Sequence, residues 1–480
     1  MVQPFTVMKA GCMQLQPAFS TVTSTNKRKI MKKNAVYGFT VFLFVLAAVG
    51  IFFKYKHDET VRENRVYPVL ERKGAAASSD EFKAVQSRST ALLNTIRTKP
   101  GDIKTNIALA SLYIQEGRAS GNYLYYDQAA MKYVNAALAK EPGNFDALSL
   151  KALLMMSQHH FAEGLQIAEQ AKNINPYNAF IYGLIIDGNV EMGNYTAAIE
   201  NADKMVSIRP DIRSYSRISY LREIHGDYPG AIEAMKMAVT AGLPGDEGTE
   251  WSRIQLAHLY ENTGDLKSAE MNYTIALENR PAYAYALSGL ARIATANKDY
   301  QKAIGLYLQA DSLVNDFTIK EELSDMYTMT GDKEKASALA QTVVDGMNAA
   351  AAKEKKNDSS GHYSDREMAY AFLKTGATGK ALEHALLEYN RRPQNIDVNE
   401  TMAWVYYSKG EYAKALPYAK TALKTNSMNP VLLCRTGLVY AKNGDAATAA
   451  KLLKAGLQAN PNIAASLKTM SEQALKLLEP

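Results

Sequence analysis

The sequence contains a repeating unit of about 34 residues, and this unit limits what the chain can fold into. Its clearest two copies run from Thr249 to Ala310. In each copy apolar residues recur at helical spacing on both sides of a short polar turn, which predicts a pair of amphipathic helices. The corresponding small residues Ala257 and Ala291 lie 34 positions apart. A unit this short cannot bury its own apolar face, so successive copies are expected to stack on one another.

The unit resembles the tetratricopeptide repeat, a helix–turn–helix of about 34 residues. The resemblance rests on small residues where the two helices touch, on the aromatic Tyr260 late in the first helix, on Ala269 early in the second helix and on Pro281 at the exit. It covers about residues 102–480. It implies an all-α, right-handed superhelical solenoid of about ten helical hairpins with a C-terminal capping helix.

The register of the repeats predicts the boundaries along the chain. Exit prolines at Pro142, Pro176 and Pro210 keep the spacing of 34, whereas residues 346–363 interrupt it with a polar stretch. We therefore predict a basic N-terminal tail (1–34), a transmembrane anchor (35–53), a stalk or linker (54–101), a first block of about seven repeats (102–345), a flexible connector (346–363) and a second block of about three repeats with the capping helix (364–480).

Residues 35–53 form a stretch of 19 residues without a charge. As a helix it would span roughly 28 Å, close to the hydrocarbon thickness of a bilayer. We favour an uncleaved anchor over a cleaved signal, because the stretch is longer than a typical signal core and no small-x-small cleavage site precedes Lys54. Met31 is an alternative start, in which case the first 30 residues are not translated.

The charges around this stretch predict its orientation. Five basic residues lie between Lys27 and Lys33, and a short basic tail tends to stay on the cytoplasmic side while a long domain is exported. We therefore expect a single-pass protein of the inner membrane with the solenoid on the periplasmic side. Residues 1–73 carry a net charge of +8 and the remainder a net charge of −2. A repeat region without a basic excess argues against nucleic acid as a partner.

No residue pattern predicts chemistry. The adjacent His159 and His160 fall at a turn inside the second repeat and point apart on a helix, so we expect a solvated turn and not a metal site. The two cysteines, Cys12 and Cys434, are too few for a disulfide framework. No phosphate-binding glycine loop or nucleophile motif is present. We predict no catalytic, cofactor-binding or metal-binding residues, and no enzyme.

The resemblance implies that partners bind the inner surface of the superhelix, which residues of the first helix of each repeat line. Aromatic and arginine side chains there are typical binding anchors, although large residues can also simply fill the space at curved junctions. The candidate residues for binding a partner are Phe180, Asp187, Arg213, Tyr220, Trp251, His258, Tyr285, Arg292, Glu400, Trp404 and Tyr407.

We interpret the chain as a membrane-anchored scaffold that binds a protein or peptide segment in a concave groove. The alternative is a repeat-containing component of an envelope apparatus for secretion or for polysaccharide export, in which the aromatic groove would bind sugar faces. Binding of a glycan without a protein partner would distinguish the alternative from the scaffold.

Overall fold

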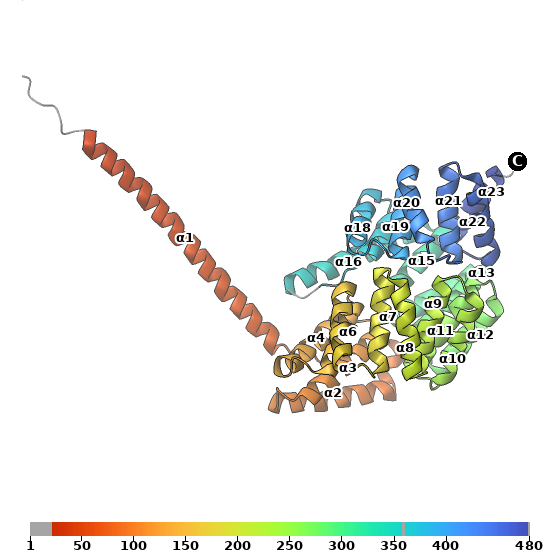
Figure 1. Cartoon of the computed structure of the whole chain (residues 1–480), viewed down its shortest axis with the longest axis horizontal. Helices are drawn as coiled ribbons and strands as arrows, with labels where there is room; N and C mark the ends of the chain where they lie inside the picture. Colours follow the sequence, from red (N-terminus) through yellow and green to blue (C-terminus); the bar gives the residue numbers. More distant parts are fainter. Residues whose placement is uncertain (1–21, 358–360, 479–480) are drawn as a thin grey trace, which may run out of the picture. The chain divides into compact units, whose positions relative to one another are not determined.

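The computed structural model describes residues 22–357 and 361–478, and all regular secondary structure in these ranges is helical. The chain divides into two compact units, an N-terminal unit of residues 1–67 and a repeat unit of residues 68–480. Figure 1 shows the helices of both units, coloured along the sequence.

The described part of the N-terminal unit contains one helix, α1 (Val22–Asn64). Its segment Val36–His57 has a mean hydropathy of 2.4, and none of it is buried inside the protein. Among the described residues it is the one helix long and apolar enough to cross a membrane. The uncharged stretch 35–53 thus forms the middle of a longer helix. Residues 1–21 of the predicted tail lie outside the described residues.

The repeat unit begins before the first repeat. A short 3-10 helix, η1 (Gly74–Ser78), leads into α2 (Asp80–Thr98), whose N-cap Ser79 accepts a hydrogen bond from the Phe82 amide. Phe82 is fully buried. Arg72 donates two hydrogen bonds of 2.7 Å to the Glu116 carboxylate of the following helix. The part of the expected linker after Pro68 therefore packs onto the first hairpin, because it carries an apolar face and a buried ion pair.

Ten helical hairpins follow, and a last helix packs against the final pair. The first seven hairpins are α3 (Ile103–Ser120) with α4 (Tyr123–Lys140), α5 (Phe145–Ser157) with α6 (Phe161–Ile174), α7 (Ala179–Met192) with α8 (Tyr195–Ile208), α9 (Ile212–Ile224) with α10 (Tyr228–Ala241), α11 (Glu247–Asn262) with α12 (Leu266–Asn279), α13 (Ala284–Ala296) with α14 (Tyr300–Asp311), and α15 (Phe317–Met329) with α16 (Lys333–Asn357). The last three are α17 (Asp365–Lys374) with α18 (Thr378–Arg391), α19 (Ile396–Ser408) with α20 (Tyr412–Ala422), and α21 (Pro430–Lys442) with α22 (Ala446–Ala459), before α23 (Ala465–Leu478). The all-α solenoid of about ten hairpins is confirmed.

Local sequence explains how a hairpin forms, as the fifth hairpin shows. In the fifth one, Gly264 takes a positive φ of 77° at the turn, which an L-residue adopts only at a cost. Asp265 then caps α12 by accepting a hydrogen bond from the Ser268 amide at 3.1 Å. Ala257 and Ala269 are fully buried where α11 and α12 meet. Small residues at these positions let the two backbones approach closely, as the repeat pattern predicts.

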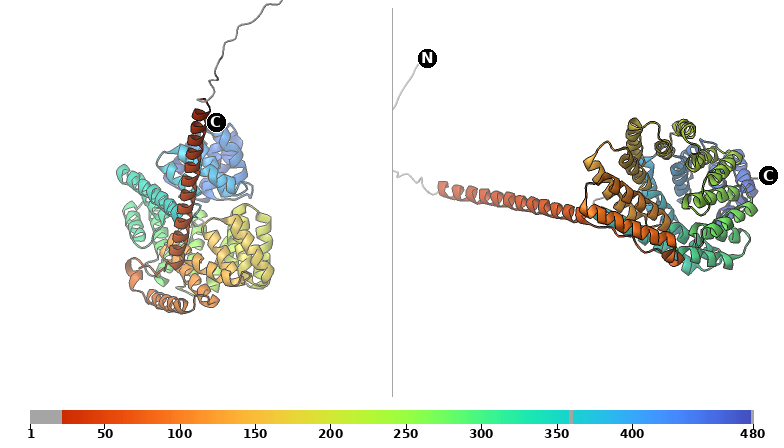
Figure 2. Two further views of the ribbon diagram at one scale, coloured as in Figure 1. Left: turned by 90° about the vertical axis from the view of Figure 1, so that its left-hand side faces the viewer. Right: turned by 90° about the horizontal axis from the view of Figure 1, so that it is seen from below.

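Successive turns of the superhelix contact each other, which we call the inter-turn seam. The second block lies beside the first block's yellow hairpins in Figure 1 and in the left view of Figure 2. Contacting residues are 193 to 205 positions apart, so one superhelical turn takes about six repeats of about 34 residues. At each point a turn inside one hairpin meets the segment that ends a later hairpin or follows it. The contacts join Gly121 and Asn122 to Asn315, His159 and His160 to residues 361–363, residues 190–195 to residues 392–396, Gly226 to Asn426, and Gly264 to Ala459.

The predicted connector takes part in this seam. Its first part is helical, because α16 continues to Asn357. Its last part is held at the turn between α5 and α6, where the Tyr363 amide donates to the Gln158 carbonyl at 3.0 Å. Residues 358–360 lie outside the described residues.

Candidate functional site

The predicted groove residues all lie on the first helices of hairpins, namely α7, α9, α11, α13 and α19. They fall into separate groups with different surroundings. On α7 and α9, the Arg213 guanidinium lies 5.2 Å from the centre of the Phe180 ring. Asp187 forms an ion pair with Arg217 at 2.6 Å, and Tyr220 is exposed. This group leaves one arginine and one tyrosine accessible.

Trp251 and Tyr285 lie edge to face, with ring centres 5.3 Å apart. They line a pocket of about 280 Å³ between α11 and α13 on one side and α3, α4 and α5 on the other. We call it the tryptophan pocket. Its lining residues are Ile114, Arg118, Tyr123, Asp127, Leu153, Leu154, Ser157, Glu247, Trp251 and Tyr285. Trp251 and Tyr285, two of the predicted binding residues, are therefore brought together, and residues of the first two repeats form the rest of the tryptophan pocket.

Charges are paired at the edge of the tryptophan pocket. Arg118 and Glu247 form an ion pair at 3.3 Å that joins α3 to α11. Ser157 donates a hydrogen bond to Asp127 at 2.8 Å. Burial raises the pKa of Tyr123 and keeps its phenol protonated, although the nearby Arg118 opposes the shift. The pocket therefore offers apolar surface, neutral hydroxyls, one internal ion pair and the carboxylate of Asp127, which accepts a hydrogen bond from Ser157.

His258 and Arg292, in contrast, belong to an ion-pair network. Arg292 contacts His258 Nε2 at 2.6 Å, Glu261 at 3.2 Å and Glu322 at 3.0 Å. Burial and the arginine charge lower the pKa of His258 to about 4, so the imidazole is neutral near pH 7. Both side chains are occupied by neighbouring helices, which favours a structural role over the predicted binding role.

Glu400, Trp404 and Tyr407 on α19 surround a second buried charge pair. Arg435 donates to Glu400 at 2.6 Å and lies 4.9 Å from the Trp404 ring centre. Burial opposes ionisation of Glu400, but Arg435 outweighs it and lowers the pKa of the carboxyl. Tyr407 stacks on Trp404 with ring centres 5.0 Å apart. This group packs α19 against α21, and Trp404 is half-buried there.

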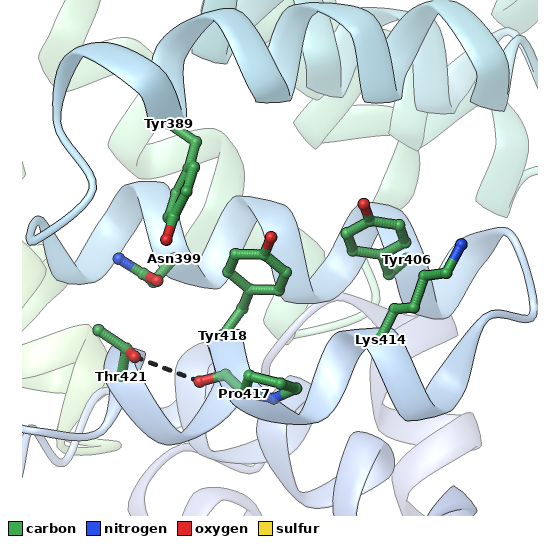
Figure 3. A pocket seen from close by; sticks show the side chains of 7 residues that line it. All are labelled: Tyr389, Asn399, Tyr406, Lys414, Pro417, Tyr418 and Thr421. Atoms are coloured by element: carbon green, nitrogen blue, oxygen red, sulfur yellow. Dashed lines mark hydrogen bonds between the residues drawn. The ribbon is translucent and has the colours of Figure 1, made fainter.

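The structure also contains a pocket that the sequence did not indicate, which we call the tyrosine pocket (Figure 3). It has a volume of about 370 Å³ and lies on α18, α19 and α20. Its lining residues are Tyr389, Asn399, Tyr406, Lys414, Pro417, Tyr418 and Thr421. Four of them come from the second helix α20, whereas the expected groove uses first helices alone. The sequence signal that could have indicated this pocket is the presence of three tyrosines within one and a half repeats.

The histidine pair differs from expectation. His160 is buried, and its Nε2 lies 2.5 Å from the Gly361 carbonyl oxygen. His159 Nδ1 lies 2.8 Å from the Tyr363 carbonyl oxygen. The expected solvated turn was wrong, because the next superhelical turn covers it. No group of three or more histidine, cysteine or acidic residues within 22–357 and 361–478 is placed to hold a metal ion.

The sequence profile described as "Tetratricopeptide repeat" matches residues 254–316 and 401–462. A tetratricopeptide repeat protein from Parabacteroides merdae is similar to 51% of this chain and 92% of its own, with 17% identity and a TM-score of 0.39. The Cut9 and Hcn1 hetero-tetramer of the APC/C shares 13% identity over 90% of this chain and 82% of that one, with a TM-score of 0.37. No curated relative matches the sequence.

The two profile matches fall in different blocks, one over α11 to α14 and one over α19 to α22. They therefore cover hairpins whose turns and caps follow the repeat pattern described above. The chain therefore contains tetratricopeptide repeats, and its first two hairpins meet the fifth and sixth across an aromatic pocket.

Proposed function

We propose that this chain is a membrane-tethered scaffold that binds an extended protein segment and performs no catalysis. The observation that carries the proposal is the tryptophan pocket, where Trp251 and Tyr285 meet residues of the first two repeats. Its volume of about 280 Å³ lies just below the about 300–1,000 Å³ typical of small-molecule sites. A space of this size suits one large side chain of a longer segment.

The chemistry of the pocket specifies that side chain. Its walls are mainly leucine, isoleucine and aromatic surface. Arg118 and Glu247 neutralise each other, and Asp127 is engaged by a hydrogen bond from Ser157. An apolar or aromatic anchor gains most in such a place, while a charged anchor would lose its hydration without a free partner. The partner segment therefore carries an aromatic or large aliphatic residue at the anchoring position.

The tether is α1, whose apolar residues are exposed on every side. A helix that is apolar all round and unburied in the protein is suited to lipid. With the basic tail retained in the cytoplasm, the repeat unit faces the periplasm. The alternative, a component of an envelope apparatus for secretion or polysaccharide export, would use the same tether.

Selection of peptides from a random display library tests the scaffold. We expect enriched peptides to share an aromatic or large aliphatic residue, and Trp251→Ala to weaken their binding by about tenfold or more. Met271→Ala is the matched control, because Met271 is exposed on α12 and does not line the pocket. Peptides that bind both variants equally well would refute the assignment of the anchor.

Protease treatment of intact spheroplasts tests the location. With a tag at the C-terminus, we expect external protease to remove the tag from a periplasmic repeat unit. Protection until lysis would place the repeat unit in the cytoplasm and would exclude the proposed orientation, while leaving the peptide test unaffected.

A further inference from the structure

The tyrosine pocket combines stacked aromatic rings with hydrogen-bonding groups. Tyr418 of α20 lies between two other tyrosines, edge to face with Tyr389 at 5.2 Å and nearly parallel to Tyr406 at 5.7 Å. Figure 3 shows the three phenol oxygens around one hollow. None of these three hydroxyls forms a hydrogen bond with another residue of 22–357 or 361–478, so they are available to a ligand.

The floor of the pocket carries an acceptor with a fixed orientation. Asn399 is 2% exposed. Its side-chain nitrogen donates to the Pro393 carbonyl at 2.8 Å and to the Asn395 carbonyl at 2.7 Å. These two bonds use both amide hydrogens, so the amide cannot flip, and its oxygen lies on the side of Tyr418 (Figure 3). That oxygen accepts no hydrogen bond from any residue in the described ranges and, unlike the Asn106 oxygen, it is not fully buried, so a ligand in the pocket can donate to it.

Asn106 makes the same two bonds, to the Pro100 and Asp102 carbonyls, in the first repeat. The asparagine-to-loop contact is thus a structural feature of two repeats. Only at Asn399 does it coincide with three tyrosines and a pocket of about 370 Å³. The difference between the two repeats lies in what surrounds the amide oxygen.

The groups in the pocket select among ligand classes. Aromatic faces suit a quaternary ammonium, but the Lys414 ammonium, which is paired with Glu411 at 2.6 Å, already lies 5.8 Å from the centre of the Tyr406 ring and takes the place of such a cation. Aromatic faces also suit a proline-rich segment, but such a segment has few N–H groups that could donate to the Asn399 oxygen. A sugar ring offers an apolar C–H face to the tyrosines, hydroxyl donors to Asn399 and acceptors to the phenols and to Lys414.

We propose that the tyrosine pocket binds one hexose unit of a neutral glycan. The apolar face of the ring stacks on Tyr418, a ring hydroxyl donates to the Asn399 oxygen, and the Tyr389 hydroxyl binds a second ring oxygen. The site lies on α18 to α20, separate from the tryptophan pocket of α3 to α5, α11 and α13. The two sites share no residue, so glycan binding here and peptide binding in the tryptophan pocket are measured separately. Glycan binding without peptide binding would favour the envelope-apparatus alternative over the scaffold.

The test uses the full-length chain purified in detergent. Maltohexaose, cellohexaose and chitohexaose are each titrated by calorimetry at up to about 5 mM, together with a proline-rich decapeptide. We expect at least one hexasaccharide to bind. Tyr418→Ala should weaken it about tenfold, through loss of the stacked ring, and Tyr389→Phe about threefold to tenfold, through loss of one hydroxyl.

Two controls keep the result interpretable. Tyr177→Ala removes a tyrosine that is 81% exposed and far from the pocket lining, and it should bind as the wild type does. Tyr389→Phe keeps the ring, so it reports on the site even if Tyr418→Ala fails to fold. The absence of binding by all three glycans, equal binding by Tyr389→Phe and the wild type, or binding of the proline-rich peptide in their place would each overturn the proposal.

Discussion

Replacing Gly193 with alanine should destabilise the repeat unit far more than the same change at Gly410. Both glycines end the first helix of a hairpin with a similar positive φ, 79° and 76°. Alanine in that conformation costs about 1–2 kcal/mol at either site. A Cβ on Gly410 would meet nothing within 4 Å, whereas a Cβ on Gly193 would lie 2.3 Å from the Gln394 carbonyl oxygen in the next superhelical turn.

The additional cost at Gly193 follows from the contacts that must open. Relief of the clash separates residues 190–195 from residues 392–396. This separation breaks the bond from Asn395 to the Val190 carbonyl, the bond from the Ile396 amide to the Tyr195 hydroxyl, and the Arg392 to Glu191 pair. At about 0.5–1.5 kcal/mol for each bond, the difference between the two variants is about 2–4 kcal/mol.

Hydrogen exchange measured peptide by peptide is the suitable assay, because a solenoid need not unfold in one step. In Gly193→Ala we expect faster exchange in both 190–196 and 392–398, and in Gly410→Ala faster exchange only around its own turn. Gly226→Ala and Gly264→Ala should fall between the two, since their added Cβ would lie 2.6 and 3.2 Å from carbonyl oxygens of the next turn. Equal effects at Gly193 and Gly410 would refute the seam.

Four further results are expected. Ala257→Leu should overpack the fully buried contact between α11 and α12 and cost about 1–3 kcal/mol in urea unfolding, an effect that exposed Ala413→Leu should lack. Arg392→Ala should cost about 1.5–3 kcal/mol, because it removes the bonds of a buried guanidinium to Glu388 and Glu191 while Arg391 still pairs with Glu388; an unchanged midpoint would contradict this. Burial and Arg292 lower the pKa of His258 from 6.5 to about 4, so unfolding takes up a proton and acidification from pH 6.5 to 4 lowers stability through this group. Burial raises the pKa of Glu223 from 4.5 to about 7, so its contribution is lost as pH rises from 4.5 to 7, and Glu223→Gln should steepen the acid loss seen in melting temperatures.

The hairpins could be predicted because their determinants are local. The small residues Ala257 and Ala269, the turn Gly264-Asp265 and the exit Pro281 lie within one unit of about 34 residues, and each acts on its own neighbours. The burial of Phe82 was missed because residues 68–98 lack the repeat pattern, although they supply an apolar face to the first hairpin.

The pockets and the seam could not be predicted for the opposite reason. Trp251 was found by register, but Tyr123 and Arg118 reach it only after the chain has turned through several hairpins. The contact of His160 with Gly361 joins residues 201 positions apart. Such pairings depend on the sum of many small rotations between repeats, and no single repeat encodes that sum.

The inter-turn seam also fixes how many hairpins lie in one superhelical turn. In a solenoid whose repeats touch only their neighbours, one unit more or fewer changes the length and little else. Here, removal of one 34-residue unit between Gly193 and Gln394 would displace every later loop by one repeat. Each of these loops would then face a different hairpin of the first superhelical turn. Arg392 would then no longer meet Glu191, and the histidine pair would no longer meet residues 361–363. The gain or loss of a repeat within the chain should therefore break the contacts of the inter-turn seam. It should be tolerated best after α20, where few hairpins remain to be displaced.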